Sequence, residues 1–352
     1  MTPPSPVPVL LAGDEFVLNR VMAEELAAVA GAEAWALREL EFPWPSVPFG
    51  PVAEVDEAAG TEDQMIEALD GVRLCLTQLA PLTKRILSAC PDLELFAVSR
   101  GGPVNANLDA ATARGVVVTF APGRNATATA EHTVAMMLAA TRRIPHTHAD
   151  LAGGTWRGDY YRYDLVGPEL EDSTVGLVGY GAIGSRVARM VTGFGAHVVV
   201  YDPYVAPEAL GAGVKKVELD ELLSRSGFVT LHARVTPENT GMIGAAQLAL
   251  MPPGSVLVNC ARGALVHYDA VCDALDSGHL FGAAFDVFPE EPIPPDSRLL
   301  RTPHIVMTPH LAGASRETAQ KAATIVAADV GRFLRGEELA HCANPEALNT
   351  SA

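Results

Sequence analysis

The chain has 352 residues, 49% hydrophobic and 19% charged, which is long enough for two domains with substantial cores. Its 42 acidic and 25 basic residues give a formal net charge of −17, which argues against nucleic acid or an anionic membrane as a partner. The five cysteines form no CxxC pair, no apolar stretch approaches the ~20 residues of a membrane span, and the first residues lack the basic region of a signal peptide. We therefore expect a cytoplasmic protein without a disulfide framework or a metal site.

The first part of the chain alternates strand-like and helix-like segments. A helical pattern covers Asn19–Val29, and the Pro-rich residues 42–51 predict a loop. Apolar, β-rich runs predict strands at Val7–Ala12, Leu74–Leu79, Leu93–Ser99 and Gly115–Phe120. This alternation is typical of a parallel sheet with helices on both faces.

A second alternation follows an apolar helix predicted at Glu131–Arg143 and a loop predicted at residues 152–170. Its predicted strands are Thr174–Gly179, His197–Asp202, Val229–His232, Ser255–Asn259, Phe281–Val287 and Ile305–Thr308. The segment 286–296 is too Pro-rich for regular structure, and Ser315–Arg335 predicts one long helix. The sequence thus favours an α/β protein with two doubly wound parallel sheets.

A GxGxxG turn, GYGAIG, follows the first strand of the second half and opens a helix. In this context the first glycine permits a tight turn, the second lets the backbone approach a pyrophosphate, and the third lets the helix pack on the strand. The helix N-terminus offers N–H groups to the phosphates. We expect a dinucleotide to contact Gly179, Gly181, Ala182, Ile183 and Gly184.

Asp202 ends the next strand, 18 residues after Gly184. A carboxylate at this place binds the adenosine ribose hydroxyls and repels a 2′-phosphate. No arginine follows it, because the next residues are Pro203 and Tyr204. The sequence therefore predicts NAD rather than NADP as the cofactor.

Three polar residues, Arg262, Glu291 and His310, follow strands of the second half. Taken singly, an arginine at such a place is more often part of a surface salt bridge, a glutamate is more often simply solvated, and a histidine more often has a structural role. Together they suit a 2-keto acid, because Arg262 could hold the carboxylate and polarise the carbonyl while His310 supplies a proton. Glu291 would favour the protonated imidazole.

The motifs GYGAIG, VYDP, NCARG, DVFPEEP and TPHLAG, in this order and spacing, resemble the D-isomer-specific 2-hydroxyacid dehydrogenase family. The resemblance implies a flavodoxin-like substrate domain, residues 1–119 and 312–352, and an inserted Rossmann NAD domain, residues 120–311. It also implies hydride transfer at C2 of a small D-2-hydroxy or 2-keto acid. The helix Glu131–Arg143 and the following aromatic loop resemble the arm that forms the family's homodimer.

The family's catalytic residues match Arg262, Glu291 and His310. The resemblance places the substrate carboxylate on the loop containing Arg100, Gly101 and Gly102, and again on Arg262. It places Asp286 near the nicotinamide amide. Four further residues in or beside these motifs are expected to contact the cofactor: His232, Cys260, Ala261 and Gly313. One departure lies at Ala233–Arg234, where the family more often has Leu-Pro or Pro-Leu.

The resemblance leaves the substrate open and keeps one alternative, an NAD-sensing regulator similar to the C-terminal-binding co-repressors. Formate dehydrogenases resemble this chain with a Gln at the position of Glu291, which disfavours that branch. The ACT-type domain of long phosphoglycerate dehydrogenases is not expected. The stretch Leu74–Pro81, which matches the phosphate-binding stretch of phosphoglycerate dehydrogenases, contains no cation. We therefore expect an uncharged C3 substituent rather than 3-phosphohydroxypyruvate.

Overall fold

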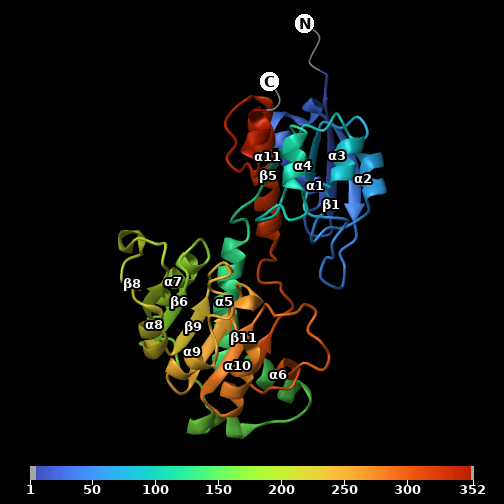
Figure 1. Cartoon of the computed structure of the whole chain (residues 1–352). Coiled ribbons are helices and arrows are strands. Elements are labelled where there is room, and N and C mark those ends of the chain that lie inside the picture. Colours follow the sequence, from blue (N-terminus) through green and yellow to red (C-terminus); the bar gives the residue numbers. More distant parts are fainter. Residues whose placement is uncertain (1–4, 350–352) are drawn as a thin grey trace. The chain divides into compact units, whose positions relative to one another are not determined.

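The computed structural model describes residues 5–349, which form two compact units. Of these described residues, 5–125 and 315–349 belong to unit 1, and Ala126–Ala314 form unit 2. In Figure 1 the blue, cyan and red parts of the chain belong to unit 1, and the green to orange parts belong to unit 2. The two unit limits lie a few residues after the domain limits set from the sequence.

Unit 1 contains a five-stranded sheet in which every pairing is parallel. Its strands are β1 (Val7–Asp14), β2 (Trp35–Phe42), β3 (Leu74–Thr77), β4 (Leu95–Val98) and β5 (Val117–Phe120). They lie in the order β2-β1-β3-β4-β5, so the direction of winding reverses between β1 and β3. This is the flavodoxin-like order.

Helices cover both faces of this sheet. They are α1 (Asn19–Ala30), α2 (Glu62–Ala68), α3 (Lys84–Ala89), α4 (Leu108–Ala113) and α11 (Arg316–Leu334). Alternate side chains of β1 point to opposite faces, so Leu10 packs in the core with α2 and α3 while Leu11 packs in the core with α1 and α11. The long helix α11 is capped at its N-terminus by Ser315, whose Oγ accepts a hydrogen bond from Thr318 N.

Unit 2 contains a seven-stranded parallel sheet in the order β12-β11-β10-β9-β6-β7-β8. Its strands are β6 (Thr174–Val178), β7 (His197–Tyr201), β8 (Lys215–Lys216), β9 (Phe228–Leu231), β10 (Ser255–Asn259), β11 (Leu280–Phe285) and β12 (Ile305–Met307). The winding reverses between β6 and β9, as in a Rossmann fold. The expected architecture of two doubly wound parallel-sheet domains is confirmed.

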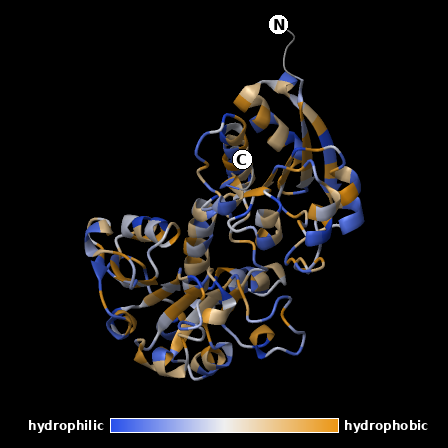
Figure 2. Cartoon of the chain, turned by 45° about the horizontal axis from the view of Figure 1, so that its top comes forward, coloured by the Kyte–Doolittle hydropathy of each residue, from blue (hydrophilic) through white to orange (hydrophobic). Residues whose placement is uncertain are grey.

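The helices of unit 2 are α5 (Ala126–Thr141), α6 (Ile144–Ala152), α7 (Gly184–Gly193), α8 (Leu219–Arg225), α9 (Ala245–Leu250) and α10 (Tyr268–Asp276). Helix α5 packs against α7, β10 and β11, and more than half of its residues are buried. In Figure 2 orange, apolar stretches run along the strands, in agreement with their burial. No helix among residues 5–349 is both long and apolar enough to cross a membrane.

Two of the differences from the sequence-based expectations have a clear physical reason. Strand β2 was not predicted, because Arg38, Glu39 and Glu41 interrupt its apolar pattern; such charges are typical of an edge strand. Helix α5 begins at Ala126, five positions before the predicted start at Glu131, since the run of alanine and threonine there favours helix less clearly than the apolar residues that follow.

Candidate active site

The glycine turn lies between β6 and α7 in unit 2. Gly179 has φ +99°, and a Cβ atom there would lie 2.8 Å from the carbonyl carbon of His232. A Cβ atom on Gly184 would lie 2.3 Å from Gly179 O, so this glycine allows the helix to approach the turn. A Cβ atom on Gly181 would meet nothing within 4 Å, so the backbone there faces open space that a pyrophosphate can occupy. The turn fits a dinucleotide.

Asp202 follows β7 and is fixed beside this turn. Its Oδ2 accepts a hydrogen bond from Tyr180 N at 2.7 Å, and its Oδ1 accepts one from Tyr204 N at 2.9 Å. These bonds hold the carboxylate at the end of β7, next to the glycine turn. This is the position from which an acid distinguishes a ribose hydroxyl from a 2′-phosphate.

His232 and Cys260 are neutral groups at the ends of β9 and β10. Burial lowers the pKa of His232 to about 3, and its Nε2 lies 3.1 Å from Thr230 Oγ1. Burial also raises the pKa of Cys260 to about 12, which keeps its thiol protonated. Ala261 N donates to Asn259 Oδ1 at 3.0 Å. The structure thus places these residues at the same sheet edge as the glycine turn, because the carboxyl ends of parallel strands share one edge.

His310 and Glu291 form a direct pair in unit 2. His310 Nδ1 lies 2.7 Å from Glu291 Oε2, and Phe288 N donates to Glu291 Oε1 at 2.9 Å. The hydrogen bond with Glu291 raises the pKa of His310 above its ordinary value. Burial alone would raise the pKa of Glu291, but the bonds from His310 and Phe288 and the charge of Arg262 lower it. Both shifts favour the form of the pair in which the imidazolium lies beside the carboxylate.

Arg262 follows β10, and its charge acts on both members of the pair. It lowers the pKa of Glu291, and it opposes protonation of His310. Its side chain is exposed, with Nη1 donating to Ala261 O at 2.7 Å, and its backbone carbonyl accepts from Asn259 Nδ2 at 2.9 Å. The three residues singled out from the sequence therefore lie together, with Arg262 acting through its charge.

Asp286 fixes the loop that carries His310. This carboxylate is 1% exposed. Its Oδ1 accepts from Thr308 Oγ1 at 2.6 Å and Leu311 N at 2.9 Å, and its Oδ2 accepts from Ala312 N at 2.8 Å. All three donors flank His310, which has φ +50°. These three hydrogen bonds of the Asp286 side chain thus go to the loop, and its contact with the nicotinamide remains a prediction.

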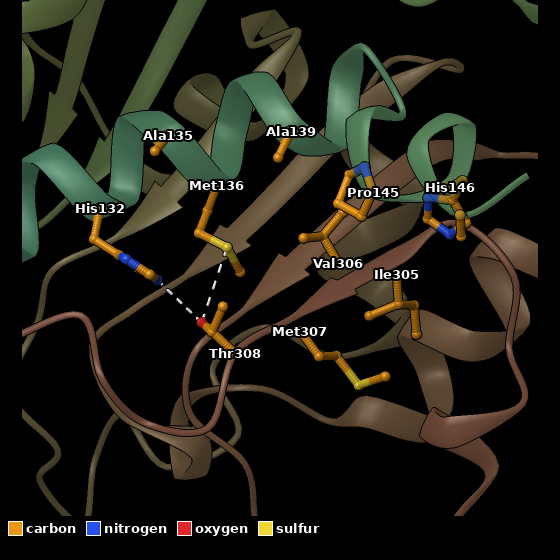
Figure 3. A pocket seen from close by; sticks show the side chains of 11 residues that line it. His132, Ala135, Met136, Ala139, Pro145, His146, Ile305, Val306, Met307 and Thr308 are labelled. Atoms are coloured by element: carbon orange, nitrogen blue, oxygen red, sulfur yellow. Dashed lines mark hydrogen bonds between the residues drawn. The ribbon is translucent and has the colours of Figure 1, made fainter. Parts of the chain in front are cut away.

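Two residues of this network, His132 and Thr308, were not singled out from the sequence. His132 Nε2 lies 3.0 Å from Thr308 Oγ1 and 3.7 Å from Asp286 Oδ1. Figure 3 shows His132 and Met136 extending from α5 toward Thr308, beside a recess that also borders α6 and β12. A histidine beside an acid on an otherwise apolar helix, at Glu131–His132, is the one local signal that could have indicated it.

In unit 1 the loop after β4 carries the residues expected to hold the substrate carboxylate. The guanidinium of Arg100 is bonded to the carboxylate of Glu57, and its Nη1 donates to Glu57 O at 2.9 Å. A Cβ atom on Gly101 or Gly102 would meet nothing within 4 Å. The loop therefore offers open backbone, while the side chain of Arg100 is already engaged. Among the described residues, no group of His, Cys, Asp or Glu is arranged to hold a metal ion.

Comparison with known proteins agrees with this geometry. Residues 134–312 match the family model described as "D-isomer specific 2-hydroxyacid dehydrogenase, NAD binding domain". D-3-phosphoglycerate dehydrogenase of Mycobacterium tuberculosis is 40% identical over 289 residues, 82% of this chain and 53% of that protein. Glyoxylate reductase of Korarchaeum cryptofilum is 36% identical over 295 residues, 83% of this chain and 89% of that protein.

A solved structure extends the likeness to the whole fold. The apo structure of D-lactate dehydrogenase from Escherichia coli superposes with a TM-score of 0.75 at 25% identity, covering 95% of this chain and 99% of that one. The chain spans about half the length of the curated phosphoglycerate dehydrogenases that it matches.

Proposed function

Because the chain belongs to the D-isomer-specific 2-hydroxyacid dehydrogenase family, we propose that it interconverts a small D-2-hydroxy acid and its 2-keto acid. The observation that carries this proposal is the 2.7 Å contact between His310 Nδ1 and Glu291 Oε2. It engages one ring nitrogen and leaves Nε2 on a side chain that is 51% exposed. That nitrogen can give a proton to a substrate carbonyl oxygen or take one from a hydroxyl.

The chain's own residues then divide the chemistry among them. The bound cofactor would accept the hydride from C2 as NAD⁺ in oxidation and supply it to C2 as NADH in reduction. In reduction His310 Nε2 delivers a proton to the carbonyl oxygen, and in oxidation it removes the hydroxyl proton. Glu291 stabilises the imidazolium that precedes reduction and follows oxidation. Arg262 binds the substrate carboxylate and polarises the C2 carbonyl with its planar fork.

The remaining site residues are assigned roles on the same basis. We propose that the glycine turn with Ala182 and Ile183 binds the pyrophosphate and that Asp202 binds the ribose. His232, Cys260, Ala261, Asp286 and Gly313 complete the cofactor contacts. The backbone of the loop Arg100–Gly102 assists Arg262 in holding the carboxylate.

NADH oxidation tests the proposal directly. The purified chain is assayed against glyoxylate, hydroxypyruvate, pyruvate, 3-phosphohydroxypyruvate and longer 2-keto acids. We expect turnover of at least one acid, formation of the D-hydroxy acid, and a preference for NADH over NADPH. Binding of NADH without turnover of any acid would contradict an enzymatic role and favour an NAD-sensing regulator.

We also propose that the chain forms a homodimer through α5, the helix expected at Glu131–Arg143, and the aromatic loop that follows it. This loop exposes three large aromatic side chains: Trp156 is 84% exposed, Tyr161 94% and Tyr163 91%. Leaving such large apolar rings in contact with water is unfavourable, so their exposure in a single chain favours a partner surface. Light scattering should give twice the chain mass, and Tyr161→Glu together with Tyr163→Glu should shift it toward the monomer. A wild-type monomer at micromolar concentration would contradict this.

All five cysteines are free thiols, which supports the proposal of a cytoplasmic location.

A further inference from the structure

The sheet of unit 1 has a reversal point between β1 and β3. In open α/β sheets, ligands bind beyond the carboxyl ends of the strands at such a point. Asp14 and Phe16 lie at the end of β1, and Gln78 directly follows β3. These residues therefore border the position in unit 1 where the topology favours a ligand.

Arg124 is held at this reversal point although it follows β5. Its Nη1 donates to Gln78 Oε1 at 2.7 Å, and its Cζ lies 5.8 Å from the centre of the Phe16 ring. The ring itself makes an edge contact with Trp44, with 5.8 Å between centroids. The guanidinium is thus fixed by an amide oxygen from one side of the reversal and by an aromatic ring from the other.

The charge of Arg124 is poorly compensated. Gln78, its hydrogen-bond partner, is neutral, and no acid within the described residues lies in salt-bridge range of it. Burial and the neighbouring charge of Arg100 lower the pKa of Arg124 to about 10. Arg100 is already paired with Glu57. Cations held partly away from water are normally paired, so this half-buried one favours an anion from outside the chain.

Asp14 is the remaining charged group that faces Arg124. Its attraction opposes the lowering of the pKa of Arg124. Burial raises the pKa of Asp14, while its Oδ1 accepts from the N–H groups of Phe16 and Val17, which lowers it. Asp14 acts on Arg124 through its charge, and among the described residues no direct ion pair joins the two. The hydrogen bond to Gln78 uses one of the five N–H donors of the guanidinium, which leaves donors for a bidentate contact.

We infer that Arg124 is a specificity-determining residue that binds a terminal carboxylate or phosphate of the substrate, a second anionic group in addition to the carboxylate beside C2. This inference rests on the proposed function. The carboxylate beside C2 is assigned to Arg262 and to the open backbone of Gly101 and Gly102, which follows β4. Arg124 lies instead over β1 and β3, so the two anionic groups have different partners.

The inference replaces the expectation of an uncharged C3 substituent. That expectation rested on the lack of a cation in Leu74–Pro81, and this stretch indeed contains none. The structure brings one to it from 46 positions further along the chain, because Arg124 is bonded to Gln78. A cation therefore borders the wall where the sequence indicated none.

Matched substrate pairs test the inference. The full chain is assayed with NADH on 2-ketoglutarate against 2-ketovalerate, and on 3-phosphohydroxypyruvate against hydroxypyruvate. We expect the charged member of at least one pair to be favoured by tenfold or more in kcat/KM, and the pair that shows it identifies the anion. Arg124→Met should bring that ratio to within about threefold of unity.

Two further variants separate charge from folding. Gln78→Glu keeps the shape of the contact but supplies Arg124 with a carboxylate, so the preference for the charged substrate should again be lost. Arg114→Met removes an exposed arginine at the end of α4 and should leave the ratio unchanged. Equal or better turnover of the uncharged members by the wild type overturns the inference. An unchanged ratio in Arg124→Met does so as well.

Failure of the proposed function is recognised separately, because then neither member of any pair is reduced. In that case calorimetric titration of the full chain with succinate and with inorganic phosphate tests the site alone. Binding of either anion to the wild type, weakened at least tenfold in Arg124→Met, supports the site. Absence of binding, or equal binding to the variant, overturns it.

Discussion

The carboxyl ends of the two parallel sheets differ in how their charged side chains are paired. At the edge of unit 2, His310 is paired with Glu291, and the buried Asp286 accepts three hydrogen bonds from the loop around His310. At the edge of unit 1, Arg124 is bonded to a neutral amide. Paired charges keep a proton donor in one geometry, whereas a cation without a direct ion pair is suited to binding an anion.

The comparison separates two kinds of variant. A change in the unit 2 network should lower turnover of every substrate, because it alters the proton-transfer group. A change at Arg124 should alter the preference between charged and uncharged substrates.

The largest effect is expected for His310→Ala. This variant lacks the proton donor, so kcat should fall by roughly 10²–10⁴ for each substrate that the wild type reduces. The measurement is steady-state NADH oxidation, with NADH binding followed by fluorescence as the control for an intact cofactor site. Turnover within threefold of the wild type would remove His310 from the mechanism.

Asp202→Ala should change the choice of cofactor. Removing a carboxylate that faces the 2′ position should lower the preference for NADH over NADPH by at least about tenfold, since a charge in this setting contributes on the order of 1–3 kcal/mol. Asp202→Asn is the matched variant, because it keeps an acceptor for Tyr180 N but loses the charge. A wild-type preference for NADPH would contradict the assignment.

Features whose residues lie close together in the sequence could be predicted, whereas contacts between residues far apart in the sequence could not. The turn from Gly179 to Gly184 lies within six residues, and the strand ends that carry Arg262, Glu291 and His310 each have a local motif. The Arg124–Gln78 bond joins residues 46 positions apart, and the His132–Thr308 contact joins residues 176 positions apart. Such pairs depend on which strands become neighbours, and a local pattern does not carry that information.

Edge position explains the missed strand. Strand β2 pairs only with β1, and most of its side chains are exposed, so its residues are not selected for a continuous apolar run. The central strand β1, with both faces buried, has six successive buried residues and was recognised from its composition. Burial on both faces is therefore what made a strand predictable.

Thr308→Val tests whether the buried network positions His310. Valine has the same shape but cannot donate to Asp286 Oδ1, and a hydrogen bond to a charged group contributes about 1.5–3 kcal/mol. If the loss of this hydrogen bond lets His310 move from its position, kcat should fall by roughly 5- to 20-fold, while KM for NADH should stay unchanged. Thr308→Ser should restore most of the rate. A fall in stability without a fall in kcat would show a structural role only.

Glu291→Gln should shift the pH dependence of kcat to lower pH. In the reductive direction, the rate of the variant should be nearest to that of the wild type at low pH, where His310 is protonated in both. Glu291 raises the pKa of His310, so in the wild type the imidazolium that reduction requires persists to a higher pH than for an ordinary histidine. Without the carboxylate the pKa of His310 falls, and the decline of reduction with rising pH should begin at a lower pH. Oxidation, which needs the neutral ring, should correspondingly remain active to a lower pH. The measurement is kcat against pH in both directions, because a general loss of rate lowers both curves without displacing them. An undisplaced profile would show that Glu291 orients the ring without setting its charge.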